Sequence, residues 1–330
     1  MMQFKIKNLK LKIFLATFYI LHFTFLITCY AAFEDLGCGA RPIGMGNAFC
    51  GVADDINAFI YNPAGLSQLR KLQLGTMYAQ LYPGLSDKSS IANNFLGVAY
   101  PFGSSANRTS LGIGWFNLAV TSDPDRSNAT YKENTYIISY ARTIEMFSFG
   151  LSVKFHTKEY GQNYWTSVNP TFGKALTASG IGFDVGLLFK PSEKTTIGFS
   201  VLDFNQPSLY LVTPSQIPFV IKAGVGYKFD PVWGWEDIIG AIDLTYRDGE
   251  YKGYAGLEGW LLDRSVGLRF GFGAGSSSFG NISIGASYQL TEEIYNNDFR
   301  IDYAFVYPLS GIDPTGGTHR ISLTIGFGPK

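Results

Sequence analysis

Apolar and polar residues alternate with a period of two over most of the chain from about Lys71 to the C-terminus. In the clearest run, apolar side chains at 147, 149, 151, 153 and 155 alternate with small or polar ones at 148, 150, 152, 154 and 156. Successive side chains of a strand point to opposite faces, so this pattern predicts strands with one apolar and one polar face. Further runs follow the same rule over 181–190, 196–201, 266–273, 281–288 and 321–327, and weaker ones over 71–82, 91–102, 109–120, 131–144, 217–229, 237–247, 251–261 and 298–307.

These runs add up to about fourteen strands of roughly ten residues, which is the length of a tilted strand that crosses a bilayer. No segment after the first thirty residues is apolar enough to cross a membrane as a helix. We therefore expect an all-β fold, a transmembrane antiparallel β-barrel over residues 70–330. Apolar residues such as Phe183 would face lipid, and small ones such as Gly182 would face the lumen. A soluble β-sandwich, whose apolar face turns inward, is the alternative.

The predicted connections alternate in length, as they do in bacterial barrels with short periplasmic turns and longer outer loops. If the first strand rises from the periplasm, the turns at 144–146, 191–194 and 262–263 lie inside, and the long segment 161–179 lies outside. Both termini would then lie in the periplasm. Trp233, Trp235 and Tyr295 would lie near the inner interface and Tyr164 and Trp165 near the outer one, where amphipathic rings are favoured.

Residues 1–31 have the features of a signal peptide. Lysines at 5, 7, 10 and 12 precede an apolar run from Ile13 to about Thr28, and Cys29 and Ala31 are small residues at the −3 and −1 positions of a cleavage site. We expect cleavage after Ala31 and export to the outer membrane of a Gram-negative-type bacterium. A membrane-anchor helix and a lipoprotein box at 26–29 are the alternatives.

Residues 32–69 lack strand alternation and are rich in glycine. Asp54 or Asp55 can cap a short helix that begins at Ile56, and Asn62-Pro63 should end it, because proline disfavours helical geometry in the preceding residue. We expect this segment to be a compact hatch packed inside the barrel. An ordinary periplasmic tail is the alternative.

Two glycines and two cysteines of this segment carry specific expectations. Gly44 and Gly46 allow the backbone to approach the wall closely or to take a positive φ. Cys38 and Cys50 remain as an even pair after cleavage, and in an oxidising compartment they could close a loop of about a dozen residues. A disulfide and two small buried thiols are the two alternatives.

Charge and composition exclude several functions. The 26 basic and 26 acidic residues leave no net charge, so no nucleic-acid partner is expected. No CxxC, HExxH or GxSxG motif occurs, and His156 and His319 are the only histidines after the leader. We therefore expect no catalytic residues, no metal, no cofactor and no enzyme.

Charged residues on the polar faces of the predicted strands are candidates for lining the lumen. They are Lys154, Asp184, Lys222, Asp243, Glu258 and Arg269. Opposite charges inside a barrel also form cross-strand networks that brace the wall, and this structural role is the alternative.

Two parts of the chain resemble a known superfamily, the FadL-type long-chain fatty-acid transporters and the related PorV/PorQ proteins. The stretches at 39–48, 53–55 and 62–66, which read GARPIGMGNA, ADD and NPAGL, resemble their N-terminal hatch. The stretches at 302–306 and 316–323, which read DYAFV and GGTHRISL, are similar to the closing hairpin on the PorV/PorQ side. The resemblance implies a hatch with gate residues Gly44, Gly46, Asp54, Asp55, Asn62, Pro63, Ala64 and Gly65.

The resemblance implies two functions. In FadL-type transporters the hatch moves to admit hydrophobic compounds, so the partners would be outer-membrane lipid and a hydrophobic small molecule. In PorV the barrel serves type IX secretion and binds the C-terminal signal domains of secreted proteins. Either barrel would be inserted by the barrel assembly machinery. This chain is shorter than typical FadL members, and Gly328-Pro329-Lys330 follows the last aromatic residue.

Overall fold

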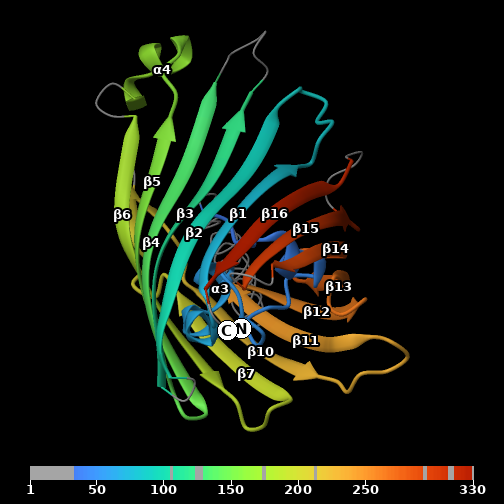
Figure 1. Ribbon diagram of the computed structural model, residues 1–330. Coiled ribbons are helices and arrows are strands. Elements are labelled where there is room, and N and C mark those ends of the chain that lie inside the picture. Colours follow the sequence, from blue (N-terminus) through green and yellow to red (C-terminus); the bar gives the residue numbers. More distant parts are fainter. Residues whose placement is uncertain are drawn as a thin grey trace, which may run out of the picture. The chain divides into compact units, whose positions relative to one another are not determined.

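The computed structural model describes residues 33–104, 107–122, 129–172, 176–211, 214–292, 296–310 and 316–328 (Figure 1). The predicted signal peptide and Tyr295 lie outside these residues. Within them, no helix is long and apolar enough to cross a membrane.

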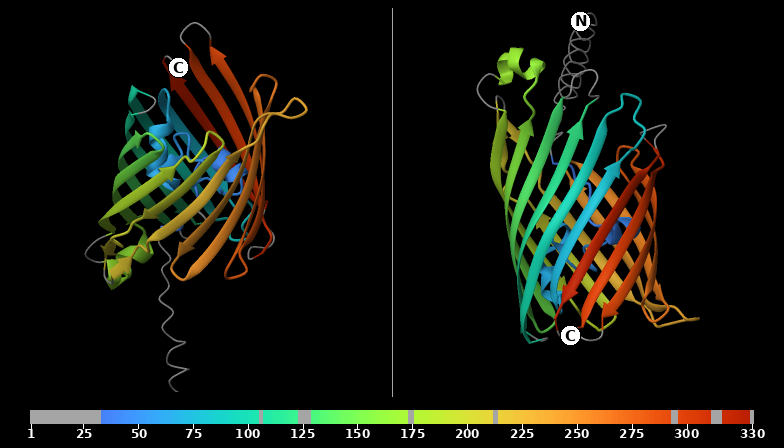
Figure 2. Two further views of the ribbon diagram at one scale, coloured as in Figure 1. Left: turned by 90° about the horizontal axis from the view of Figure 1, so that it is seen from below. Right: turned by 45° about the horizontal axis from the view of Figure 1, so that its top comes forward.

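Fourteen antiparallel strands of the described chain close into a barrel (Figures 1 and 2). They are β1 (Leu72–Leu81), β2 (Ser90–Ser104), β3 (Asn107–Thr121), β4 (Thr130–Ile144), β5 (Phe147–Tyr160), β6 (Thr177–Phe189), β7 (Thr195–Leu202), β10 (Val220–Lys228), β11 (Glu236–Arg247), β12 (Glu250–Leu261), β13 (Val266–Gly275), β14 (Gly280–Glu292), β15 (Asn297–Pro308) and β16 (Thr318–Phe327). Two short strands, β8 (Ser208–Tyr210) and β9 (Pro214–Gln216), form a separate sheet between β7 and β10. Every run predicted from the alternation overlaps one of the barrel strands.

The ring closes because β1 pairs with both β2 and β16. Closure pairs the two strands that would otherwise be edges, and a sheet inside a bilayer requires this because hydrocarbon offers no hydrogen-bonding partner. The predicted facing is also confirmed. Phe183 is 39% exposed on the outer surface, whereas the next residue, Asp184, is 1% exposed and points inward.

Most of the longer connections lie at one end of the barrel, but the connection 229–235 lies at the other end and the short turn 248–249 lies among the long loops. The turns at 145–146, 190–194 and 262–265 lie at one end, here called the short-turn end. The connections 161–176, with α4 (Tyr164–Val168) and η2 (Pro170–Phe172), and 203–219 lie at the long-loop end. The exposed rings of Trp233 and Tyr164 lie in connections at opposite ends, as expected.

The expectation that both termini lie at one end is wrong for the described residues. The first residue of β1 and the last of β16 share the short-turn end. However, the Phe33 N–H donates to Glu133, close to the start of β4, and Glu34 pairs with Arg247 at the last position of β11. The described chain therefore begins near the long-loop end.

Three short helices precede the barrel: α2 (Ala40–Gly44), α3 (Ala58–Tyr61) and η1 (Pro63–Gln68). The helix expected at Ile56 starts two residues later, because Asp55 accepts hydrogen bonds from the N–H and side-chain amide of Asn57 and forms a turn there. Asn62 ends α3 in an extended conformation, with φ −161°, as the following proline requires. Its side chain then caps η1 by accepting from the N–H of Ala64.

Candidate functional site: contacts between the N-terminal segment and the inner wall

Residues 33–69, here called the N-terminal segment, lie within the ring of strands (Figures 1 and 2). They pack against the inward-facing side chains of the barrel. Large apolar side chains such as Phe49, Phe59 and Tyr61 are fully buried and share one core with the wall residues Met77 and Phe95. Contacts reach strands on all sides of the ring. The segment is thus a second layer of core inside the sheet.

Arg41 of α2 is the centre of a buried charge network. Its guanidinium donates from Nε and Nη2 to the Glu258 carboxylate on β12, both at 2.8 Å, and from Nη1 to Asp55 at 3.0 Å. It also pairs with the partly exposed Asp54. Arg269 on β13 donates to the same Glu258 carboxylate from the other side. Glu258 therefore joins the segment to the wall through two arginines.

The network closes into a ring through β15. Arg269 reaches Asp302 at 3.2 Å, Arg300 donates to Asp302 at 2.8 Å, and Arg300 also donates to Asp55 of the segment at 2.8 Å. Burial alone would raise the pKa of the Asp55 carboxyl, but Arg41 and Arg300 lower it to about 2. We call this ring the arginine network. Its six members are Arg41, Asp55, Glu258, Arg269, Arg300 and Asp302.

A second set of charges holds the segment on β10 and β11. Asp243 accepts from the backbone N–H groups of Phe49, at 2.7 Å, and of Cys50. Lys222 forms an ion pair with Asp35 and lies 5.4 Å from the centre of the Tyr61 ring. Both are lumen candidates predicted from the sequence, and both contact the N-terminal segment.

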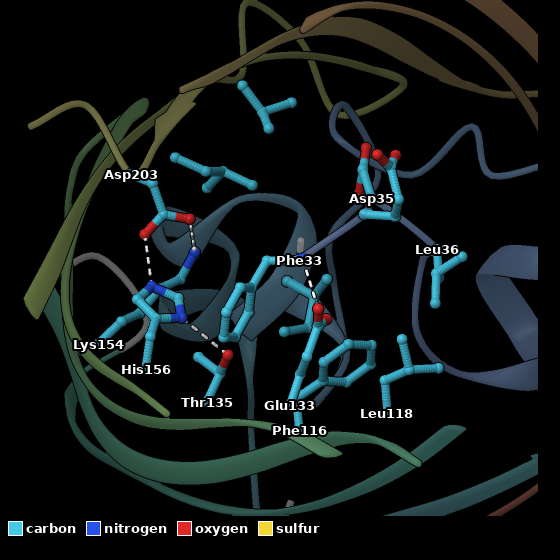
Figure 3. A pocket seen from close by; sticks show the side chains of 14 residues that line it. Phe33, Asp35, Leu36, Phe116, Leu118, Glu133, Thr135, Lys154, His156 and Asp203 are labelled. Carbon is cyan, nitrogen blue, oxygen red and sulfur yellow. Dashed lines mark hydrogen bonds and ion pairs between the residues drawn. The ribbon is translucent and has the colours of Figure 1, made fainter. Parts of the chain in front are cut away.

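The remaining two candidates, Lys154 and Asp184, belong to a third cluster, of which Figure 3 shows Lys154, His156 and Asp203. The Lys154 ammonium lies 3.0 Å from Asp184 and 3.1 Å from Asp203, the residue that follows β7. His156 forms two hydrogen bonds, one between Nε2 and the Asp203 carboxylate at 2.8 Å and one between Nδ1 and the Thr135 hydroxyl at 2.9 Å. Asp203 and Thr135 were not predicted from the sequence, because no local pattern marks which residues meet across the barrel.

A small cavity adjoins this third cluster. Its volume is about 70 Å³, and its lining includes Phe33, Phe116, Leu118, Lys154 and His156 (Figure 3). The Phe33 ring lies edge-on to His156, with ring centres 4.9 Å apart. Such a volume holds a few water molecules, whereas pockets for small-molecule ligands span roughly 300–1,000 Å³.

A larger cavity of about 280 Å³ lies at the long-loop end, beside the turn 276–279. Its lining includes Tyr82, Lys252, Phe279 and Asn281. No lumen candidate lines it. Within the described chain, no three His, Cys, Asp or Glu side chains are placed to hold a metal ion.

The Asn62-Pro63-Ala64 turn packs against two glycines of the barrel wall. Asn62 donates to the Leu187 carbonyl of β6 at 3.0 Å. A Cβ at Gly150 on β5 would lie 2.1 Å from the Ala64 nitrogen, and one at Gly186 on β6 would lie 2.2 Å from Asn62 Oδ1. Any side chain on these two positions would therefore displace the turn.

Glycines of the segment itself have matching roles. A Cβ at Gly44 would lie 3.1 Å from the Gly285 Cα of the wall, and Gly46 has a φ of +68° beside the backbone of Gly271. Gly65 packs on Ala53, where a Cβ would lie 2.0 Å from the carbonyl oxygen. Close approach and positive φ, both expected from the sequence, are the reasons for glycine here.

Cys38 and Cys50 are free, buried thiols, so the disulfide that the sequence left open does not form in this structure. Cys38 Sγ faces the Asn57 side chain at 4.0 Å, whereas Cys50 Sγ faces the Lys222 carbonyl of β10 at 3.6 Å. Burial raises the pKa of both thiols. They are the two small buried thiols of the second alternative.

Comparison with protein families identifies the chain. The model of type IX secretion system membrane proteins of the PorP/SprF type matches residues 55–325. The chain belongs to this family. This confirms the resemblance to type IX secretion and FadL-type barrels drawn from the N-terminal motifs and the closing hairpin. PorP/SprF proteins are outer-membrane barrels, in agreement with the fold.

Solved structures share the fold at low sequence identity. CymD, a monoaromatic hydrocarbon channel, has a TM-score of 0.64 and 13% identity, and the alignment covers 90% of this chain and 99% of that one. The toluene transporter TbuX of Ralstonia pickettii has a TM-score of 0.61 and 13% identity, with 89% and 99% covered. A FadL homologue of Pseudomonas aeruginosa has a TM-score of 0.59 and 12% identity, with 88% and 98% covered. No curated protein matches the chain.

Proposed function

We propose that this PorP/SprF protein serves type IX secretion as a closed outer-membrane barrel that binds secreted proteins through their signal domains. The N-terminal segment acts as a hatch that blocks the lumen, so the barrel is a docking platform and not a conduit. In the membrane, the short-turn end would face the periplasm and the long-loop end the outside of the cell, as in other bacterial barrels.

The arginine network is the observation that carries this proposal. Buried charges are stable only when they are paired, and removing one partner of such a pair costs about 3–5 kcal/mol. Opening the lumen would separate Arg41 and Asp55 of the segment from Glu258 and Arg300 of the wall. A hatch that opened on each transport cycle would have to break both ion pairs each time. A plug that stays in place keeps both ion pairs intact.

A hydrophobic-compound channel gated by the hatch is the second candidate. The cavity next to Phe33 supports it, because Leu118, Leu202 and Val220 give part of it an apolar lining, although charged groups such as Lys154 and Glu133 also line it. Withdrawal of the Phe33 side chain would enlarge this space. The hydrocarbon channels that share the fold agree with this candidate. At 13% identity, however, their similarity to this chain extends only to the fold.

Two measurements separate the candidates. Deleting the gene should abolish surface display of secreted proteins that carry a type IX signal domain, and wild-type protein supplied in trans should restore it. Purified protein in proteoliposomes should pass a hydrophobic fluorescent probe no faster than empty liposomes. Normal secretion in the deletion strain, together with protein-dependent probe entry, would reverse the order of the two candidates.

A further inference from the structure

A row of polar side chains crosses the outer surface of β2 to β6. Asn94, Asn117 and Asn134 stand directly opposite one another on β2, β3 and β4. Their side-chain amides form a ladder, with Nδ2 to Oδ1 distances of 2.9 Å and 3.0 Å. Thr157 on β5 and Ser179 on β6 continue the same row. We call this the asparagine row.

The asparagine row ends the apolar belt on this side of the barrel. The next outward row toward the short-turn end is apolar throughout: Leu96, Trp115, Tyr136, Phe155 and Ile181. The next row toward the long-loop end includes Lys132 and Glu159. Polar side chains are costly on a lipid-facing surface. The parts of β2 to β6 between the asparagine row and the long-loop end therefore lie outside the hydrocarbon of the bilayer.

Toward the long-loop end, the edge of β6 that faces β7 has no partner strand in the part of the chain that the structure describes. β6 pairs with β5 from Thr177 to Phe189, but with β7 only from Val185 to Phe189. Within the described residues, no strand pairs with the β7 side of β6 above Val185. The part of this edge at and beyond the asparagine row, Thr177 to Ser179, therefore lies beside water or the outer interface, whereas Ile181 and Phe183 lie in the apolar belt.

Two residues that follow β7 occupy part of this edge. The Phe204 N–H donates to the Phe183 carbonyl at 3.0 Å, and the side chain of Asn205 bonds the neighbouring groups. Its Oδ1 accepts from the Phe183 N–H at 3.0 Å, and its Nδ2 donates to the Ile181 carbonyl at 2.8 Å. A side-chain amide carries the same donor and acceptor as a peptide group. Asn205 thus stands where a peptide group of a neighbouring strand would stand.

The β8–β9 hairpin does not extend the sheet at this edge. Pro207 and Leu209 lie over the inner face of β6, each with an atom 3.4 Å from the place of a Cβ on Gly180. Leu209 also packs against Ala178 and Ile217. Backbone groups of alternate residues point to the same side of a strand, so those of Ser179 and Thr177 point to the β7 side, as Phe183 does.

We infer that the β6 edge from Thr177 to Ile181 receives an extended strand of a secreted protein, which adds to the sheet beside Ser179 and displaces the Asn205 amide from the Ile181 carbonyl. The inference rests on the proposed function, which supplies the partner. Strand addition obtains affinity from main-chain hydrogen bonds, and exposed edges are its usual templates. Thr177 and Ser179 are small, exposed side chains on the outer face of this edge, and Pro207 and Leu209 cover its inner face.

Ser179→Pro tests the edge directly. Proline removes the N–H that points to the β7 side but keeps the pairing with β5, and proline is tolerated on edge strands. Ser179→Ala is the matched control, because it retains the N–H. We expect purified Ser179→Pro protein to bind a type IX signal domain from the same cell about tenfold more weakly than wild type, because main-chain hydrogen bonds are lost. Ser179→Ala should bind as wild type does.

Asn205→Ala provides the opposite test, because it removes the group that competes with the incoming strand. We expect this variant to bind the signal domain more tightly than wild type. Unchanged binding by both Asn205→Ala and Ser179→Pro would overturn the inference and leave the proposed function intact. Failure of wild-type protein to bind any signal domain would overturn both.

Hydrogen exchange on the wild-type complex makes the test independent of variant folding. Binding of the signal domain should slow exchange in the peptide that covers 177–183 and leave the peptide that covers 135–141, in the middle of the sheet, unchanged. Equal exchange in the 177–183 peptide with and without the signal domain would contradict strand addition at this edge.

Discussion

The N-terminal segment meets the wall in two ways, which differ from one side of the barrel to the other. On β12 to β15 the arginine network holds it by charge, with Arg41 and Asp55 paired to wall residues. On β5 and β6 the Asn62-Pro63-Ala64 turn lies on glycines and is held by shape and a few hydrogen bonds. Charge pairs inside protein are lost only at high cost, whereas a shape contact yields more easily. Any movement of the segment should therefore begin on the glycine side.

The largest effect should follow from removing both kinds of contact together. Deleting residues 39–66 removes Arg41, Asp55 and the Asn-Pro-Ala turn and leaves the closed ring of strands. We expect the remaining barrel to conduct small polar solutes, measured by swelling of proteoliposomes in isotonic sugar. Wild-type protein is the control. If the deletion variant assembles and conducts no more than wild type, the segment does not block the lumen.

Breaking the charge side alone should come next. Glu258→Ala leaves Arg41 and Arg269 facing each other without their shared carboxylate, and the expected loss of stability is about 3–5 kcal/mol. The measurement is the unfolding midpoint of the detergent-solubilised barrel in guanidinium. Lys194→Ala is the control, because its ion pair with Asp230 is exposed to solvent and should contribute little to stability. Equal midpoints for the two variants would show that the network does not stabilise the barrel.

Adding a side chain on the glycine side should reduce the stability of the barrel less than Glu258→Ala does. Gly150→Ala places a methyl group 2.1 Å from the Ala64 nitrogen, so the turn must shift, at a cost of about 1–3 kcal/mol. Gly253→Ala on β12 is the control, because its nearest neighbour is a carbonyl oxygen at 3.9 Å. The same unfolding measurement applies. A larger loss from Gly150→Ala than from Glu258→Ala would invert the comparison of the two sides.

The smallest effect concerns the two cysteines. Because burial raises the pKa of both thiols, Cys38 and Cys50 should resist alkylation by iodoacetamide in the folded protein and react fully in denaturant. Mass spectrometry of the alkylated protein gives the result. Rapid modification of Cys50 in the folded state, without that of Cys38, would show that the glycine side opens spontaneously.

The strands and their facing were predictable because both depend on local geometry. Side chains alternate across any strand, so Phe183 and Asp184 point to opposite sides whatever the partner strands are. The place of Gly46 was predictable for a similar reason, since a positive φ is a property of one residue. The start of α3 was missed by two residues, because Asp55 bonds to Asn57 instead of capping the helix. Its carboxylate is instead drawn into the arginine network.

The six lumen candidates were found from the alternation, but their roles were not. Lys222 and Asp243 contact the N-terminal segment, Glu258 and Arg269 lie in the arginine network, and Lys154 and Asp184 meet Asp203. Asp203 follows the last residue of β7, outside the alternating pattern, and was therefore not recognised.

The sequence by itself determined which residues form strands, which face of each strand is apolar and where the N-terminal segment ends, because these follow from contacts between near neighbours in the chain. Only the tertiary structure decided that Arg41 meets Glu258, 217 residues away, and that β7 stops short of the upper part of β6. The physical reason is closure. The register around the ring brings distant side chains to one point, and no local pattern encodes that register.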